Sequence, residues 1–299
     1  MKIFITGGVG FVGSHLSNLL LSGGHTVTAV GRRSTQALIN HPNFHYISAD
    51  TSQRGAWQEA PAEVDAVFNL AGITIFNRWS ESYKNLIYDS RILTTQNLVE
   101  SIPNEKGITL VSASATGYYG NRSDDLLAEG EPHGDDFLAR IGKDWEAEAF
   151  RAEQKGIRVV AARFGVVFGK GGGAMEKMTP VFRYGVGGPL GDGMQWFPWI
   201  HMDDLLSAFL FILENQDIAG PVNFCAPNPV RNRDLAKAMG RVLKRPSFMR
   251  VPAFMIRLIA GEFGNAFLYS QRAVPEKLLR YGFSFKYPDI TAAIENIAS

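Results

Sequence analysis

Three glycines near the start of the chain, Gly7, Gly10 and Gly13, have the spacing of a loop that holds phosphates. They lie between residues 2–6, an apolar run typical of a strand, and residues 11–21, an amphipathic stretch typical of a helix. In this setting the first glycine allows a tight turn, the second lets the backbone approach a pyrophosphate, and the third lets the helix pack closely on the strand. The phosphates would lie at the amino end of the helix. The pattern predicts a dinucleotide site, and the alternative is a glycine turn that binds no ligand.

Two arginines, Arg32 and Arg33, follow the strand expected at residues 25–30, and the next acidic residue is Asp50. Sites for NAD place an aspartate or glutamate at this point, where it binds the ribose hydroxyls. Guanidinium groups without a carboxylate suit a 2′-phosphate instead, because their planar fork can bind it through two hydrogen bonds. We therefore expect NADP(H) as the cofactor. The alternative is a solvated turn that happens to contain two arginines.

The elements that would position these residues alternate between short apolar runs and amphipathic stretches over about the first 165 residues. Such alternation predicts an α/β fold, a Rossmann-type doubly wound parallel sheet with helices on both faces. The strands are expected at residues 2–6, 25–30, 45–47, 66–70, 109–112 and 159–164, and the helices at 11–21, 80–101 and 135–154.

The composition changes after Phe168, where a glycine-rich segment is followed by stretches with a mainly helical pattern. We expect a Rossmann domain over residues 1–168, to which segments at about 196–226 return. Residues 169–195 and 227–299 are expected to form a smaller, mainly helical lobe on the substrate side.

Composition excludes several classes of protein. The chain has 299 residues, of which 45% are hydrophobic, and its 30 Lys and Arg against 29 Asp and Glu give a net charge of +1. A near-neutral balance gives no reason to expect a nucleic-acid partner. Cys225 is the single cysteine, so neither an internal disulfide nor a cysteine zinc site is expected, and no His, Cys and carboxylate spacing fits a metal. We find no membrane-span pattern or separate signal, and therefore expect a cytoplasmic protein with no membrane partner.

The glycine loop and the segment Asn69-Leu70-Ala71-Gly72 together resemble the extended short-chain dehydrogenase/reductases, the superfamily of nucleotide-sugar epimerases. Other short motifs are similar to its YfcH-type "epimerase family protein" branch: Ser90-Arg91-Ile92, SASATGYYG at 112–120, Asp144-Trp145-Glu146, WIHMDD at 199–204, PEKL at 275–278 and Tyr281-Gly282-Phe283. The resemblance spans essentially the whole chain. It implies an NADP(H)-binding, epimerase/dehydratase-like Rossmann fold with a C-terminal domain of unknown function, an unassigned small-molecule substrate and, as is usual in the superfamily, a homodimer.

The resemblance also implies where the cofactor lies. The Asn69–Gly72 segment would follow its ribose and adenine side, although small residues there also suit a loop that leaves the sheet. Residues 163–165 would meet the nicotinamide amide. The residues expected at the cofactor are Gly7, Gly10, Phe11, Val12, Gly13, Arg32, Arg33, Leu70, Ala71, Gly72, Arg163, Phe164 and Gly165.

Catalysis in the resembling superfamily uses a serine, a tyrosine and a lysine, and the resemblance assigns only part of this set. The serine hydrogen-bonds the reacting oxygen, the tyrosine passes a proton, and the lysine lowers the tyrosine pKa and binds the ribose. Ser114 matches the serine, with Ser112 as the neighbouring candidate, and Lys143 is expected in the lysine place. Four residues before Lys143 stands Ala139, and the expected helix carries no tyrosine.

The missing tyrosine leaves two hypotheses open. Tyr118 or Tyr119, after Ser114, could replace it as a proton source, or both could pack beneath the nicotinamide. On the first hypothesis, the chain is an NADP(H)-dependent oxidoreductase or epimerase-like enzyme of unknown substrate. The alternative is a non-catalytic NADPH-binding regulatory or sensor protein.

Candidate substrate-binding residues come from two segments. Residues 194–201 supply aromatic walls and one titratable ring, so Trp199 and His201 are expected to bind substrate. The alternatives are packing between lobes for the aromatic cluster and a helix cap for His201. Arg91 shares a helical face with Lys84, seven residues earlier, and this face looks either to the substrate cleft or to solvent.

Overall fold

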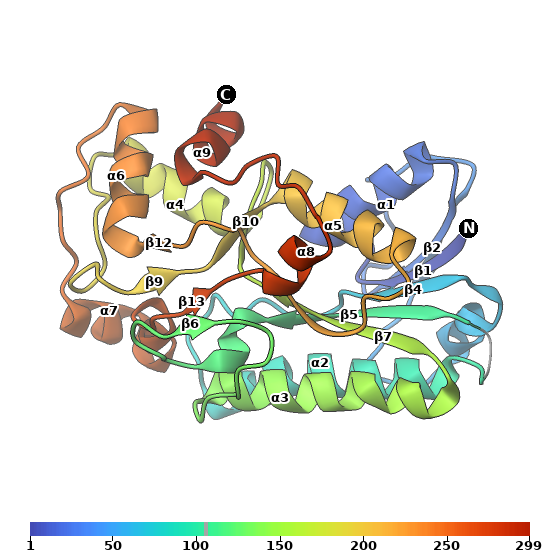
Figure 1. The fold of residues 1–299 in the computed structure, drawn as a ribbon. Coiled ribbons are helices and arrows are strands. Elements are labelled where there is room, and N and C mark those ends of the chain that lie inside the picture. The colour runs from blue at the N-terminus through green and yellow to red at the C-terminus, as the bar shows by residue number, and fades with distance from the viewer. Residues whose placement is uncertain (105–106) are drawn as a thin grey trace.

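A parallel sheet of seven strands forms the centre of the computed structural model, which describes residues 1–104 and 107–299 (Figure 1). The strand order is β11-β7-β5-β4-β1-β2-β3, and every neighbouring pair is parallel. The strands are β1 (Lys2–Thr6), β2 (Thr26–Gly31), β3 (Phe44–Ser48), β4 (Ala66–Asn69), β5 (Thr109–Ala115), β7 (Arg158–Phe164) and β11 (Gly220–Phe224). The expected Rossmann-type doubly wound fold is confirmed.

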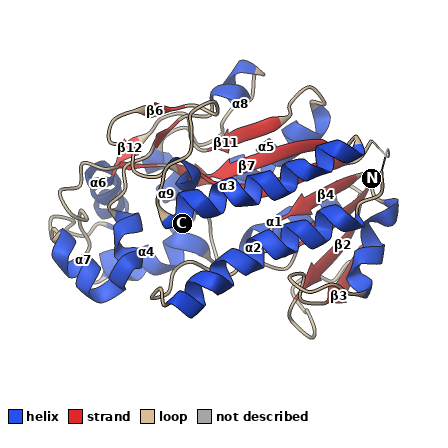
Figure 2. Ribbon diagram, turned by 90° about the horizontal axis from the view of Figure 1, so that it is seen from below, coloured by secondary structure: helices blue, strands red, loops and turns tan. Residues whose placement is uncertain are grey.

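Helices cover both faces of this sheet. The helices α1 (Phe11–Ser22) and α5 (Met202–Glu214) lie on one face, while α2 (Glu81–Ser101) and α3 (Phe137–Phe150) lie side by side on the other (Figures 1 and 2). Both of the latter begin at a side-chain cap, because Ser80 accepts a hydrogen bond from the N–H of Tyr83 and Asp136 accepts from the N–H of Leu138.

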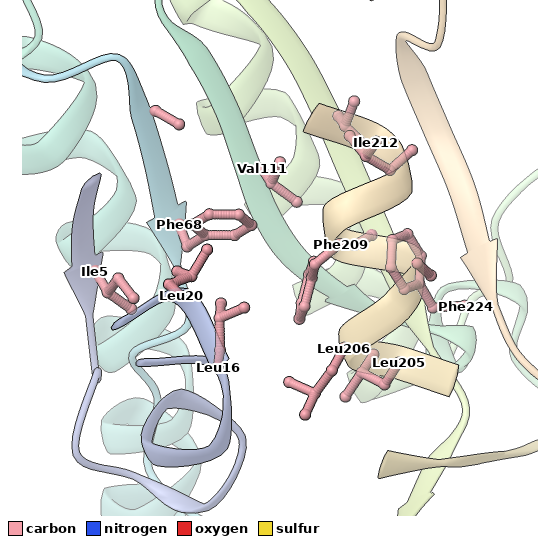
Figure 3. Close-up of a cluster of buried hydrophobic side chains, with 14 of the residues drawn as sticks. Ile5, Leu16, Leu20, Phe68, Val111, Leu205, Leu206, Phe209, Ile212 and Phe224 are labelled. Carbon is pink, nitrogen blue, oxygen red and sulfur yellow. The ribbon is translucent and has the colours of Figure 1, made fainter. Parts of the chain in front are cut away.

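The main core lies between the sheet and the α1–α5 layer, where buried side chains from both helices meet those of the strands (Figure 3). Phe68 of β4 packs edge-to-face on Phe209 of α5, with ring centroids 5.2 Å apart. Strands buried on both faces must be apolar almost throughout, which explains why their short runs of aliphatic and aromatic residues were recognisable in the sequence.

The remaining elements build a C-terminal lobe and its connections. Its helices are α4 (Gly173–Arg183), α6 (Asn232–Leu243), α7 (Ala253–Ala260) and α9 (Ile290–Ala298), while α8 (Glu276–Arg280) packs against β11 of the central sheet. Short strands pair as β6 (Leu126–Leu127) with β13 (Arg272–Ala273), β8 (Val166–Phe168) with β10 (Trp199–His201), and β9 (Trp196–Phe197) with β12 (Val230–Arg231). The 3-10 helices are η1 (Ala56–Glu63), η2 (Thr116–Tyr119), η3 (Arg151–Lys155) and η4 (Gly261–Phe267).

Two elements differ from expectation. Strand β11 enters the sheet beside β7 and was not among the expected strands, because Gly220 and Pro221 are poor strand residues. The helix expected to run to residue 154 ends at Phe150 and continues as η3. Among the helices of the described residues, none has the length and apolar character needed to cross a membrane.

Candidate functional site

A cavity of about 1160 Å³ extends from the carboxyl ends of the central strands into the C-terminal lobe. Strand order reverses between β1 and β4, and the loops that leave these two strands line the cavity. In open α/β sheets this switch point is where ligands bind.

The glycine loop forms one wall of the cavity and fits a pyrophosphate. Gly7 has a φ of +69°, which favours glycine, and a Cβ on Gly13 would lie 2.2 Å from the carbonyl oxygen of Gly7. Gly10 is exposed towards the cavity, and a Cβ there would meet only the Gly7 oxygen, at 3.1 Å. Helix α1 begins at Phe11 with no side-chain cap and no acidic residue in its first turn. Its amino end is therefore open to an anion.

The two arginines lie at the far end of the same wall. Arg32 and Arg33 follow β2, are exposed and line the cavity. The hydroxyl of Tyr46 lies 3.0 Å from the carbonyl oxygen of Gly31 and 2.8 Å from that of Arg33, which braces the turn that carries them. Asp50 also lines this end, but its Oδ1 accepts hydrogen bonds from the N–H and O–H of Ser52. A 2′-phosphate would find two cationic forks here.

Hydrogen bonds hold the loop after β4 against the glycine loop. The Thr6 hydroxyl donates to Oδ1 of Asn69 at 2.7 Å and accepts from the N–H groups of Leu70 and Ala71. Arg91, which also lines the cavity, donates to the carbonyl oxygens of Ile87 and Ile73, at 3.0 and 3.1 Å. Arg91 thus braces the loop from the α2 side.

Ser114, next to the last residue of β5, lines the cavity, but its hydroxyl hydrogen is directed at Glu146. The Ser114 hydroxyl donates to Oε1 of Glu146 at 2.6 Å. The same carboxylate accepts two hydrogen bonds from Arg163, each 2.7 Å, and all three side chains are buried. Burial alone would lower the pKa of Arg163, yet its hydrogen bonds to Glu146 raise that pKa above its ordinary value. Since an ionised carboxylate only accepts, Ser114 presents lone pairs, not its proton, to the cavity.

Helix α3 turns an apolar face to the cavity. Leu138, Ile141, Gly142 and Trp145 line it, with the i, i+3, i+4, i+7 spacing of one helical face. The prediction that Lys143 faces the cofactor is wrong: its side chain is exposed and does not line the cavity, because one residue rotates the helix by about 100°. Leu138 and Gly142, four residues apart, occupy the facing positions instead.

Comparison with known proteins agrees with this geometry. The model of the NAD dependent epimerase/dehydratase family matches residues 3–224. The chain belongs to this family. A second model, of a domain of unknown function (DUF1731), matches residues 251–297. The resemblance expected from the sequence motifs is confirmed.

Relatives match along almost the whole chain. The chain is 37% identical to the chloroplastic "Epimerase family protein SDR39U1 homolog" of Arabidopsis thaliana, over 99% of this chain and 86% of that protein. It is also 37% identical to "Epimerase family protein YfhF" of Bacillus subtilis, over 99% and 98%. The crystal structure of human epimerase family protein SDR39U1 with NADPH has a TM-score of 0.88 and 34% identity, covering 100% of this chain and 99% of the human one.

Other residues that the sequence predicts for the site of this epimerase/dehydratase family member lie outside the cavity lining. Arg163 does not line it, because its guanidinium is held by Glu146. Tyr118 does not line it either: its ring lies against the guanidinium of Arg163, 3.6 Å from the charge centre, and edge-on to His133. Tyr119 is buried, and its hydroxyl donates to Oδ1 of Asn223. These expectations for Arg163 and Tyr118 are corrected, whereas Phe164 and Gly165 do line the cavity.

Trp199 and His201 also lie in the interior rather than at a ligand. Both are buried and neither lines the cavity. Nδ1 of His201 accepts a hydrogen bond from the N–H of Asp203 and so caps α5, and its ring packs on Tyr287 with centroids 3.9 Å apart. Burial lowers the pKa of His201, which keeps the ring neutral as this cap requires. His201 is a helix cap and Trp199 is a packing residue, as the alternatives stated. Their assignment to substrate binding is therefore corrected.

Sequence reasoning missed Tyr269, which comes from the C-terminal lobe. Of the lining residues that the structure describes, Tyr269 alone carries a phenol, and burial raises its pKa. Leu138 lines the same cavity from α3. The apolar periodicity of residues 138–145 could have indicated the facing positions on α3. No sequence motif near residue 269 indicates a role at the site, because only the tertiary fold brings Tyr269 to the cavity.

Proposed function

We propose that the chain is an NADP(H)-dependent oxidoreductase that reduces or oxidises a small molecule without the tyrosine–lysine pair of its superfamily. One observation carries the proposal: the cavity that holds the nucleotide cradle continues past α3 into the C-terminal lobe. It therefore offers room for a second molecule beside the nicotinamide end. A protein that only bound the dinucleotide would have no need of that extension.

The cofactor part of the proposal rests on the cradle and on the arginines. The glycine loop fits a pyrophosphate, and Arg32 and Arg33 suit the additional phosphate of NADP(H). The human relative of similar length was crystallised with NADPH, which supports the same choice for this chain.

Bound NADPH supplies a hydride, and the chain's own residues then decide what kind of acceptor is suitable. The lining from β5 and α3 offers no proton donor: the Ser114 hydroxyl already donates its hydrogen bond to Glu146, and Leu138 and Gly142 carry no acidic group. A saturated ketone would become an alkoxide, a base about as strong as hydroxide. A quinone would become a phenolate-like anion with a conjugate acid near pKa 10.

These basicities decide between the two acceptors. The difference of roughly 5–6 pKa units corresponds to about 7–8 kcal/mol at 1.36 kcal/mol per unit. A positioned general acid supplies about 10²–10⁴-fold, or roughly 3–5 kcal/mol. Charge delocalisation in a conjugated acceptor therefore stabilises the product anion by more free energy than a general-acid tyrosine would supply. We propose that the substrate is a conjugated carbonyl compound, and that Tyr269 or water supplies the proton that follows the hydride.

A second function is favoured by the same apolar face of α3. Leu138, Gly142 and the engaged hydroxyl of Ser114 also describe a protein that binds NADPH and does not turn it over. The conformation or the binding partner of such a regulator would depend on whether the bound nucleotide is NADPH or NADP⁺.

Turnover separates the two functions. NADPH oxidation should be followed with a panel of quinones, enones and saturated ketones, with Gly10→Val as the control that cannot hold the cofactor. The proposal predicts oxidation with conjugated members of the panel that depends on Gly10. Tight NADPH binding with no oxidation by any member would favour the regulator.

A further inference from the structure

The half of the cavity formed by the C-terminal lobe is built from apolar side chains. It is lined by α4, residues 186–190, β9, α6 and η4. Its apolar lining residues include Met178, Phe182, Leu190, Phe197, Phe263 and Phe267. Apolar walls with few polar groups are typical of sites for apolar small molecules.

The polar groups in this half are few, and two of their atoms are already engaged in hydrogen bonds. Oδ1 of Asn232 accepts from the N–H of Leu190, and the amide nitrogen of Gln271 donates to the carbonyl oxygen of Gly120. Among the described lining residues after position 170, Lys177 is the charged one, and it is exposed. Tyr269 adds a phenol.

Such a lining cannot replace the water around a sugar diphosphate. Each hydroxyl left without a partner costs roughly 1–3 kcal/mol by protein mutational measures, and a charged phosphate costs more. A diphosphate is normally held by several fixed cationic or N–H donors. The single exposed Lys177 does not provide them.

From this lining we infer that the C-terminal half of the cavity binds an apolar molecule with one or two oxygen functions, and not a nucleotide sugar. Tyr269 is placed to hydrogen-bond such an oxygen. The inference rests on the proposed function, because it names the substrate class of the same site.

Binding can be tested without turnover by loading the protein with NADP⁺, which cannot donate a hydride. Calorimetric titration should then compare menadione, an apolar quinone, with UDP-glucose. We expect menadione to bind at least tenfold more tightly. Tighter binding of UDP-glucose, or no binding of menadione to the loaded protein, would overturn the inference. Since no hydride moves in this assay, failure here is distinct from failure to catalyse.

A charged variant at the rim provides the matched test. Val186 lines the cavity and is half exposed, so Val186→Asp introduces a carboxylate without removing a buried core residue. We expect it to weaken menadione binding at least tenfold and leave NADP⁺ binding unchanged. Tyr184→Asp is the control, because Tyr184 is 84% exposed and does not line the cavity. Equal effects of both variants would overturn the assignment of this rim to the ligand.

A second, independent observation concerns the surface around α7. Helix α7 lies at the end of the molecule remote from the N-terminus (Figure 1). It exposes several apolar side chains. Leu258 is 77% exposed, Ile259 74%, and Phe248 in the preceding segment 81%. We call Phe248, Met249, Phe254, Met255, Leu258 and Ile259 the α7 patch. Large exposed apolar patches usually mark an interaction site.

The charge of the segment that carries the α7 patch indicates the kind of partner that it fits. Residues 235–261 contain six basic residues and no acidic one, although the whole chain has a net charge of only +1. The six basic side chains, at positions 237, 241, 244, 245, 250 and 257, are all exposed. A segment that combines exposed apolar side chains with exposed cations is typical of one that lies in the interface of an anionic lipid surface.

A second copy of the chain fits this patch less well. A two-fold dimer would place the patch against itself and bring both sets of cations together. We infer that the α7 patch docks on an anionic lipid surface, in which α7 lies flat, since its 8 residues cannot span a bilayer. Val251, between the patch and the cavity, lines the cavity. The docked surface thus adjoins the ligand site. The expected absence of a membrane partner rested on the lack of a spanning segment, and docking through α7 requires no such segment.

Vesicle sedimentation tests the docking. The protein should sediment with vesicles of phosphatidylcholine and phosphatidylglycerol, less so at high salt, and not with phosphatidylcholine alone. The double variant Leu258→Asp, Ile259→Asp should reduce the sedimented fraction at least tenfold. Leu279→Asp, the same change on the exposed surface of α8, should leave it unchanged.

Two outcomes would contradict the docking. One is the absence of sedimentation with phosphatidylglycerol vesicles. The other is a concentration-dependent dimer in size-exclusion chromatography that the double variant abolishes, because the patch would then be covered by a second copy.

Discussion

Replacing both Arg32 and Arg33 by alanine should remove the preference for NADPH over NADH. Both guanidinium groups are exposed and follow β2 at the cavity wall, so their loss removes no buried contact. A hydrogen bond to a charged group contributes about 1.5–3 kcal/mol, and exposure to solvent places these two at or below the lower end. At 1.4 kcal/mol per tenfold, two such contacts correspond to at most about a hundredfold.

The assay is a fluorescence titration of NADPH and of NADH against the parent protein and the double variant. The parent should bind NADPH at least tenfold more tightly than NADH, and the variant should bind both about equally. NADH affinity should not change, because it has no 2′-phosphate. Arg241→Ala, an exposed arginine on α6, is the control and should keep the preference. Equal affinities in the parent, or an undiminished preference in the double variant, would refute the reasoning from the arginines.

Four further substitutions test the site and its supports. Gly10→Val should abolish NADPH binding in a protein whose circular dichroism is unchanged, whereas Gly13→Val should lower the melting temperature, because its Cβ would lie 2.2 Å from a carbonyl oxygen. Ser114→Ala should lower the free energy of unfolding by about 1–3 kcal/mol, since Glu146 loses a buried donor, with NADPH affinity unchanged by titration; an unchanged denaturation midpoint would contradict this. Burial lowers the pKa of His201, so as pH falls below the ordinary value of 6.5 the unfolded chain takes up a proton that the folded chain does not, and stability falls. Chemical denaturation of His201→Asn should show a weaker loss over that pH window, and an identical loss would rule out this histidine as the cause.

Much of the fold was predictable because its signals are local. Buried parallel strands must be apolar, and the glycines at 7, 10 and 13 are required by the turn and by close helix–strand packing. Strand β11 was not predictable in this way, because Gly220 and Pro221 are poor strand residues and its place beside β7 is decided by tertiary pairing.

The site was predictable at the nucleotide end and less so at the nicotinamide end. Lys143 was assigned one residue away from the cavity-facing Gly142, and a helix turns by about 100° over that distance. The aromatic cluster around Trp199 contains both lining and core residues, and composition cannot separate them. The ion pair of Glu146 with Arg163 joins α3 to β7. Neither segment alone therefore indicates that Glu146 accepts a hydrogen bond from the Ser114 hydroxyl.

The central claim is that a hydride leaves bound NADPH for a conjugated acceptor in this cavity. The most direct measurement is a single turnover of NADPH-loaded protein with menadione in the absence of oxygen, compared with NADPH deuterated at the transferred position and with a saturated bicyclic ketone of similar size. We predict that menadione oxidises the bound NADPH with a primary isotope effect, and that the saturated ketone reacts at least a hundredfold more slowly. NADPH that stays reduced while menadione is bound beside it would contradict the claim.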